Sequence, residues 1–200
     1  MVCPYYYINI MEPKFTSDWF SHHIPMWEMW LSGLKDLPFL DFLEIGSYEG
    51  RSTIWLLENI IKHNTCKITC IDSFIDHEYE EKNQKKLIQQ FIENTKTYQE
   101  KIRLIHQESF SALQNLISMN QKFDFIYIDG CHEAINVLED AVLSFKMLKQ
   151  NGIMIFDDYN WINNKEFHEI PRMGINSFMT TYSHYIKTIY VGDQLVITKL

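Results

Sequence analysis

Residues 43–52 read LEIGSYEGRS and join an apolar run to a helical pattern. The run at 39–45 predicts a short buried strand, and residues 51–63 have helical spacing. Gly46 lets the backbone turn sharply and approach a ligand, and Gly50 lets the helix lie close to the strand. The Gly-x-x-x-Gly spacing differs from the Gly-x-Gly-x-x-Gly fingerprint of dinucleotide sites. The loop alone fits either a ligand site or a tight turn that binds nothing.

The same alternation of short apolar runs and helical patterns continues along the chain. Such alternation predicts crossover units and a parallel sheet, so we expect a Rossmann-like, doubly wound α/β fold. Further strands are expected at 67–72, 102–106, 123–129 and 153–157, and helices at 78–100, 109–119 and 133–149.

The two ends of the chain differ from this pattern. Residues 1–37 predict an N-terminal helical arm, with an apolar helical stripe and with Pro25 breaking or restarting the helix. The arm could be part of the core or a lid over a site. Near the C-terminus, Pro171 and Gly174 are expected to interrupt a helical segment that runs to about residue 183. Apolar runs at 185–190 and 195–198 then flank a Gly-containing turn, which predicts an antiparallel hairpin. We expect one domain over residues 1–200.

Composition limits the partners. The chain has 200 residues and a formal net charge of −8, which disfavours a nucleic-acid duplex partner. No apolar run approaches the ~20 residues of a membrane span, and the N-terminus lacks a signal-peptide pattern. The four cysteines form no CxxC pair and are expected to be reduced thiols, which favours a cytoplasmic protein.

Ligand-type side chains follow successive strands. Glu44 closes the first strand and Asp72 the second, and Ser109 follows the third. Open α/β sheets bind ligands outside the carboxyl ends of their strands, where a carboxylate can accept both hydroxyls of a ribose. Asp72 is therefore a candidate ribose ligand, and Ser109 is placed to meet an adenine edge.

An acidic cluster is expected at the neighbouring strand ends. Asp129 ends the strand at 123–129, and Asp157 and Asp158 end the strand at 153–157. Three adjacent carboxylates need protons or a cation to offset their repulsion. Mg²⁺ or Ca²⁺ suits such oxygen ligands. The alternative is that these aspartates cap separate helices.

His132 lies three residues after Asp129. A histidine near neutral pKa could take a proton from a hydroxyl group. Asp129 is the competing candidate base. His132 could instead support the reacting groups without touching them, or contact the N-terminus of the following helix.

Through these motifs, the chain resembles the class I S-adenosylmethionine-dependent methyltransferases. Within them it resembles a metal-dependent small-molecule and sugar O-methyltransferase family with the pattern LEIGS-x-EGRST … IDSF … F-D-x-I-x-IDG-x-H … DDY. The resemblance implies that Asp72 holds the donor's ribose and Ser109 lies near its adenine. It places these residues around the rest of the donor: Glu44, Gly46, Tyr48, Gly50, Ser52 and Asp129.

The resemblance also implies a chemistry. The double acid Asp157-Asp158 is similar to the sugar branch, in which carboxylates at these strand ends hold Mg²⁺. We therefore expect O-methylation of a small hydroxylated or glycan acceptor, without nucleic-acid or membrane partners and with a homo-oligomer possible. The rival functions are a nicotinamide-dependent oxidoreductase on a similar fold and a donor-binding module without chemistry.

Overall fold

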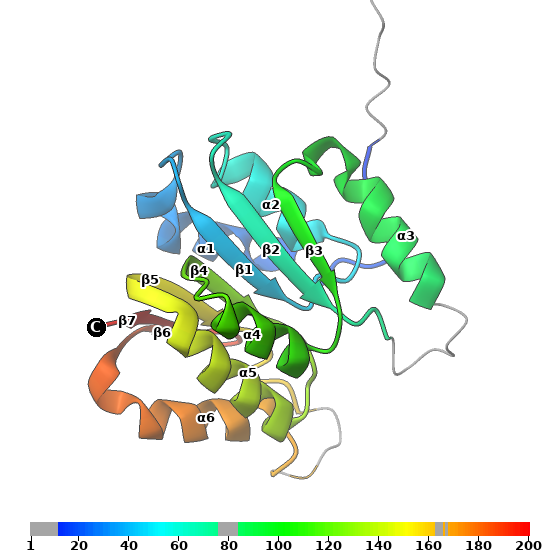
Figure 1. Ribbon diagram of the computed structural model, residues 1–200. Helices are drawn as coiled ribbons and strands as arrows, with labels where there is room; N and C mark the ends of the chain where they lie inside the picture. The colour runs from blue at the N-terminus through cyan, green and yellow to red at the C-terminus, as the bar shows by residue number, and fades with distance from the viewer. Residues whose placement is uncertain (1–11, 76–83, 163–165, 167) are drawn as a thin grey trace, which may run out of the picture.

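A computed structural model describes residues 12–75, 84–162, 166 and 168–200. Its centre is a seven-stranded sheet in the order β3-β2-β1-β4-β5-β7-β6. The first five strands pair in parallel, and the last two pair antiparallel at one edge. The doubly wound fold and the C-terminal hairpin predicted from the sequence are thereby confirmed (Figure 1).

The strands are short, as expected where both sheet faces are buried. Their bounds are β1 Asp41–Ile45, β2 Lys67–Asp72, β3 Ile102–His106, β4 Phe123–Ile128, β5 Leu148–Phe156, β6 Ile186–Val191 and β7 Leu195–Lys199.

Helices cover both faces of the sheet (Figure 1). Their bounds are α1 Ile24–Trp30, α2 Arg51–Asn59, α3 Gln84–Thr95, α4 Ser109–Ser118, α5 Ala134–Met147 and α6 Pro171–Thr181.

The core has two layers because strand side chains alternate between the faces. On β1, Leu43 joins the layer under α4, α5 and α6, whereas Phe42 joins the layer under α1, α2 and α3. On β4, Ile126 and Tyr127 divide in the same way. The carboxyl ends of these strands are thus held firmly from both sides, and the candidate site lies there.

The arm is part of this core. Trp27 of α1 is fully buried, packs edge-on against Tyr127 at 4.8 Å between ring centroids, and donates a 2.8 Å hydrogen bond to Gln194. Pro25 occupies the first turn of α1, where its missing N–H costs nothing, so it starts the helix and does not break it.

Two sequence expectations about element limits need correction. Residues 148–149 begin β5 instead of ending the preceding helix. Pro171 and Gly174 were expected to interrupt a helical segment, yet both lie within α6. A Cβ on Gly174 would approach the Ala134 carbonyl oxygen to 2.2 Å, so glycine permits the close contact of α6 with α5. Residues 78–83 of the helix expected at 78–100 lie outside the described residues.

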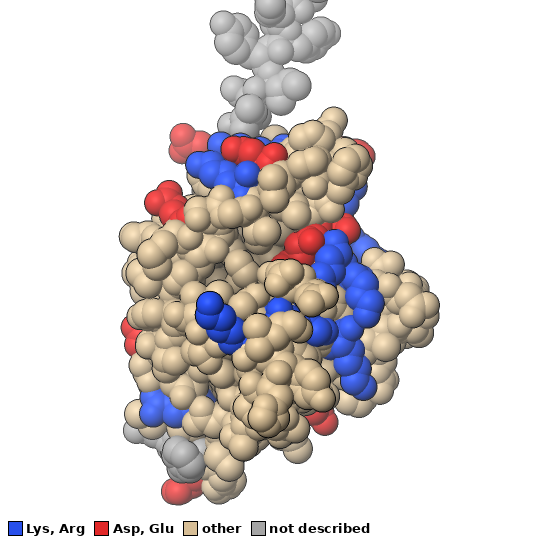
Figure 2. All heavy atoms as spheres, turned by 90° about the vertical axis from the view of Figure 1, so that its left-hand side faces the viewer, with Lys and Arg blue, Asp and Glu red and all other residues tan. Residues whose placement is uncertain are grey.

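No helix among the described residues is long and apolar enough to cross a membrane. The face shown in Figure 2 is mostly uncharged, with a short stripe of basic side chains that adjoins acidic ones.

Candidate active site

The loop between β1 and α2 depends on its two glycines. Gly46 has φ +83°, and a Cβ there would lie 1.8 Å from the backbone oxygen of Asp129. Gly50 has φ +85° and lies against Phe91 of α3. Tyr48, between them, also adopts a left-handed conformation, at φ +46°. Such conformations in a non-glycine residue are sparsely populated and gather at ligand sites.

Glu44 organises this loop from beneath. Its fully buried carboxyl group accepts hydrogen bonds from Ser47 at 2.8 Å, from Ser52 at 2.6 Å and from Thr53. Burial raises the pKa of Glu44, and these hydroxyl donors oppose the rise. Glu44 and Ser52 therefore lie at the predicted loop, and their side chains hydrogen-bond to each other.

Asp72 joins the end of β2 to the same loop. Its Oδ2 accepts the backbone N–H groups of Ser47 and Tyr48, both at 2.7 Å, and its Oδ1 accepts that of Phe74. Burial raises the pKa of Asp72, while the backbone donors lower it. Ser109 begins α4 beyond the neighbouring strand, β3, and its hydroxyl interacts with the buried Asp140.

A strap, residues 14–20, lies along the outside of the loop. The Thr16 N–H and hydroxyl donate to the two carboxylate oxygens of Glu49 at 2.7 and 2.9 Å. Arg51 pairs with Asp18 at 3.3 Å. Strap and loop enclose a cavity of about 50 Å³, whose lining includes Ser17, Trp19, Gly46, Tyr48, Tyr127 and Asp129.

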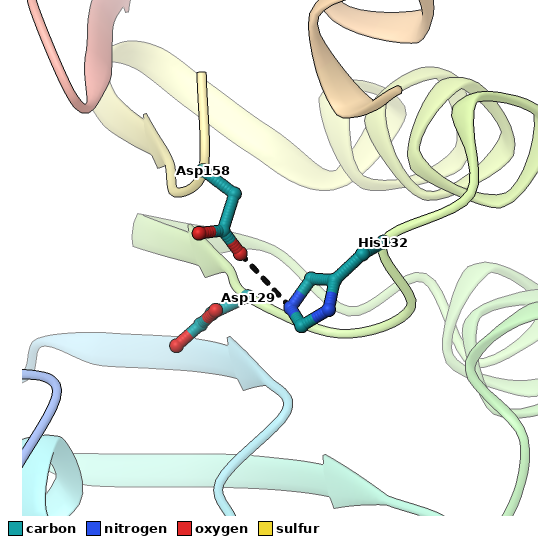
Figure 3. Close-up of side chains that lie close together, drawn as sticks. All are labelled: Asp129, His132 and Asp158. Atoms are coloured by element: carbon teal, nitrogen blue, oxygen red, sulfur yellow. Dashed lines mark ion pairs between the residues drawn. The ribbon is translucent and has the colours of Figure 1, made fainter. Parts of the chain in front are cut away.

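The acidic centre adjoins this cavity. Asp129 and His132 lie in the connection between β4 and α5, and Asp158 lies in the connection after β5, so two neighbouring connections converge (Figure 3). One ligand atom from each of the three lies within 4.8 Å of the others. His132 Nε2 is 2.9 Å from Asp158 Oδ2. The sequence-predicted base and two of the three predicted metal ligands are therefore neighbours.

Asp157 is turned another way. Its Oδ1 accepts the backbone N–H of Asp158 at 2.9 Å, and its Oδ2 contacts the hydroxyl of Tyr127. His23, from the arm, places Nε2 at 3.7 Å from Asp157 Oδ1. Asp157 is thus within the centre, but it is not one of the three residues whose ligand atoms lie within 4.8 Å of one another.

The electrostatics of the centre call for a compensating charge. The Tyr127 hydroxyl is 2.9 Å from Asp129 Oδ2 and also contacts Asp157, yet it has one proton to donate. Burial, followed by the repulsion from the neighbouring aspartates, raises the pKa of Asp129 well above its ordinary value. The same causes raise the pKa of Asp157. A cation or protons must therefore offset this charge.

Sequence reasoning missed three residues here. Tyr127 precedes Asp129 by two positions on a strand, so the two-residue period offered a signal for it. Arg51 stood in the quoted loop, but nothing indicated that it would meet the arm. His23 reaches Asp157 across a long sequence separation, and no spacing rule finds such a contact.

Helix caps do not explain the acidic residues. The residues at the N-caps of α5 and α6 are Glu133 and Ile170, and neither makes a side-chain capping bond. Asp158 has φ +56°, a conformation that holds its carboxylate toward His132.

Fold and site together define an α/β protein with a glycine-containing ligand loop beside an acidic centre. A family model described as a methyltransferase domain matches residues 43–159, which include the loop and all of this centre. The chain belongs to this methyltransferase family. Its fold is the one expected of the class I S-adenosylmethionine-dependent methyltransferases, as the sequence resemblance implied.

Three relatives illustrate the likeness. An uncharacterised protein of Acanthamoeba polyphaga mimivirus is 29% identical over 122 residues, 60% of this chain and 52% of the relative, so the chain spans about half that length. An O-methyltransferase from Bacillus cereus in complex with S-adenosylhomocysteine is 18% identical, with TM-score 0.67 over 92% of this chain and 84% of that one. MycE, a methyltransferase of mycinamycin biosynthesis in complex with Mg, S-adenosylhomocysteine and mycinamycin VI, is 14% identical, with TM-score 0.63 over 92% and 50%.

Proposed function

We propose that the protein transfers the donor's methyl group to a hydroxyl oxygen of a small acceptor, with assistance from a divalent cation. The acceptor class is a sugar ring or a catechol-like diol. The observation that carries the proposal is the meeting of Asp129, His132 and Asp158 within 4.8 Å, since Asp129 also lines the cavity of the donor loop. The donor loop and one member of the acidic centre, Asp129, thus border the same cavity.

The donor set fits a hard cation. Asp129 and Asp158 offer carboxylate oxygens, the ligands that Mg²⁺ and Ca²⁺ prefer. Asp157 could add a third carboxylate if it exchanged its contact with Tyr127. A cation bound there would lower the pKa of an acceptor hydroxyl and would orient two neighbouring oxygens. The solved structure of MycE contains Mg, which supports this assignment.

His132 is our candidate for the base. Its side chain is 44% exposed, so an acceptor can reach it, and Asp158 orients its Nε2. Asp129 is the competing base, but burial and its neighbours raise its pKa, and the cation would use its oxygens. In this arrangement the His132 ring nitrogen that Asp158 does not hold would take the hydroxyl proton as the acceptor oxygen bonds to the methyl carbon. The donor's S–CH₃ bond would break at the same time, and S-adenosylhomocysteine would leave.

The remaining residues position the reactants. The loop held by Glu44 and Asp72 fixes the donor, and the aromatic side chains at the cavity exclude water from one side of it. Orientation of this kind supplies much of the rate enhancement in a methyl displacement.

The test is methyl transfer to a panel of sugars and catechols, followed by mass spectrometry, with Mg²⁺ present or replaced by a chelator. We expect product with at least one diol in Mg²⁺, none with the chelator, and loss of turnover in His132→Ala. Methylation that proceeds equally with the chelator would refute the metal-assisted mechanism. Methylation of amines only would refute O-methylation.

A further inference from the structure

Trp19 is an aromatic residue of the strap that the fold fixes in place without burying it. It is 67% exposed. The residues on both sides of it are anchored, because Asp18 pairs with Arg51 at 3.3 Å and Phe20 is buried in the core. A large apolar side chain held in water in this way loses the free energy of burial, unless a ligand covers it.

Trp19 does not stand alone on the surface. Its ring lies 5.2 Å from the ring of Tyr48, at an interplanar angle of 43°. Both residues, together with Phe15, line the cavity between strap and loop, and Asp129 of the acidic centre borders the same cavity. A single exposed apolar side chain needs no explanation, but aromatic rings grouped beside a buried acidic centre are typical of a ligand site.

The two kinds of group at this cavity suit a ligand with two kinds of surface. Carboxylates, or a cation that they hold, bind hydroxyl groups. The face of an indole ring is apolar and carries partial negative charge, so weakly positive C–H groups and the edges of other rings pack on it. A ring with neighbouring hydroxyls on its rim and C–H groups beside them meets both requirements.

The acidic centre also limits the charge of this ligand. Asp129 lines the cavity, and Asp157 and Asp158 follow the neighbouring strand, β5. Arg51 is the cationic residue of the lining, and it already pairs with Asp18. Three carboxylates outnumber the two charges of one divalent cation, so an anionic ligand would be repelled even when the cation is bound.

We propose that Trp19 is the wall on which the ring of the methyl acceptor packs, and that the site selects uncharged ring diols. The strap would then do more than cover the donor loop, because it would determine which acceptors are held beside Asp129. Trp19 is in this role a specificity-determining residue and transfers no proton. The inference rests on the proposed function, since it takes the acceptor to be methylated at the acidic centre.

Saturation-transfer difference NMR tests the contact, because it detects weak ligands and reports which of their protons lie against the protein. The uncharged probes are methyl glucoside, methyl galactoside and catechol. Their anionic counterparts are methyl glucuronide, methyl galacturonide and 3,4-dihydroxybenzoate. Each is added to protein saturated with S-adenosylhomocysteine and Mg²⁺. In the wild type we expect at least one uncharged probe to bind through its ring C–H protons, and more tightly than its anionic counterpart.

Three variants locate the contact. In Trp19→Ala the affinity for that probe should fall about three- to ten-fold, the range for one aromatic contact. Trp19→Phe keeps an aromatic face and should restore most of the affinity. Phe39→Ala is the matched control, since it removes an aromatic side chain of similar exposure, 72%, ahead of the amino end of β1, and it should bind like the wild type.

The affinity for S-adenosylhomocysteine, measured by calorimetry, should be the same in Trp19→Ala and the wild type. A parallel loss of this affinity would place Trp19 on the donor side and overturn the proposal. Equal probe binding in Trp19→Ala and the wild type, tighter binding of the anionic counterparts, or wild-type protein that binds none of the probes would also overturn it. The proposed function fails differently, through wild-type protein that binds no S-adenosylhomocysteine or methylates no hydroxyl group.

Discussion

His132 and Asp158 meet at 2.9 Å although they lie on separate connections of the sheet, one after β4 and one after β5. The carboxylate orients the imidazole, and the same carboxylate belongs to the cluster that suits a cation. A cation bound by Asp158 would compete with His132 for this carboxylate. Proton acceptance and cation binding thus share one side chain.

Asp158→Ala should weaken cation binding while sparing the donor. We expect the affinity for Mn²⁺, titrated into protein saturated with S-adenosylhomocysteine, to fall at least about ten-fold. Donor affinity should not change, because Asp158 does not line the donor cavity. The control is Asp36→Asn, which alters an exposed carboxylate ahead of β1. Unaltered Mn²⁺ binding in Asp158→Ala would place the cation elsewhere.

Asp72→Ala should weaken binding of S-adenosylhomocysteine by about 1–3 kcal/mol, the usual cost of hydrogen bonds to a charged group. Part of the loss would come from the loop, because Asp72 accepts the N–H groups of Ser47 and Tyr48. Asp72→Asn keeps one acceptor oxygen and should lose less. Calorimetry measures both, and wild-type affinity in Asp72→Ala would show that the ribose lies elsewhere.

Gly174→Ala should destabilise the fold by about 1–3 kcal/mol or more, the cost of overpacking a tight contact. The new Cβ would lie 2.2 Å from the Ala134 carbonyl oxygen, so α5 and α6 must separate. Gly33→Ala is the matched control, since a Cβ at Gly33 meets no atom within 4 Å. Urea unfolding compares the two, and equal stability would mean that α6 can shift freely.

Asp140 should make stability fall as pH rises. Burial raises the pKa of this carboxyl from 3.8 to about 7, and it outweighs the opposite effect of the Ser109 hydroxyl. Between about pH 4 and pH 7 the folded state therefore keeps a proton that the unfolded chain has lost. Above pH 7, where both states have lost the proton, the free energy of unfolding is lower than at pH 4 by ~4 kcal/mol.

Asp140→Asn, neutral at every pH, should accordingly be more stable than the wild type at pH 8 and similar to it at pH 4. Thermal unfolding across this range measures the difference, and Asp36→Asn, at an exposed position ahead of β1, serves as the control. A stability difference that does not vary with pH would contradict the assignment.

Much of the fold was predictable because its signals are local. Short apolar strands, the Gly46 turn and the strand-end acids at positions 72, 129 and 158 all follow from periodicity and from the rule that parallel strands end at one edge. Pro25 restarts the helix, which is one of the two alternatives left open for it. Pro171 and Gly174 were misjudged because each is a helix breaker in isolation. A first-turn position for Pro171 and a close helix contact at Gly174 reversed those preferences.

The site was predictable in composition but not in detail. Asp129, Asp157 and Asp158 converge as expected, yet which oxygens face one another depends on Tyr127 and His23. Ser52 lines the cavity beside the loop, but its proton goes to Glu44. Such choices among hydrogen-bond partners depend on three-dimensional contacts between distant segments, and spacing along the chain does not encode them.

The contact of Gly46 with the backbone of Asp129 has a consequence for how the enzyme can change. Because no side chain fits between them, the loop that would hold the donor and the acidic centre that would hold the acceptor meet along a seam of direct backbone contact. Any coupling of the two ligands across this seam would be reciprocal, so each would change the affinity for the other by the same factor. New acceptors would then be acquired through the periphery, such as the strap and the turn around His132, while the seam stays constant.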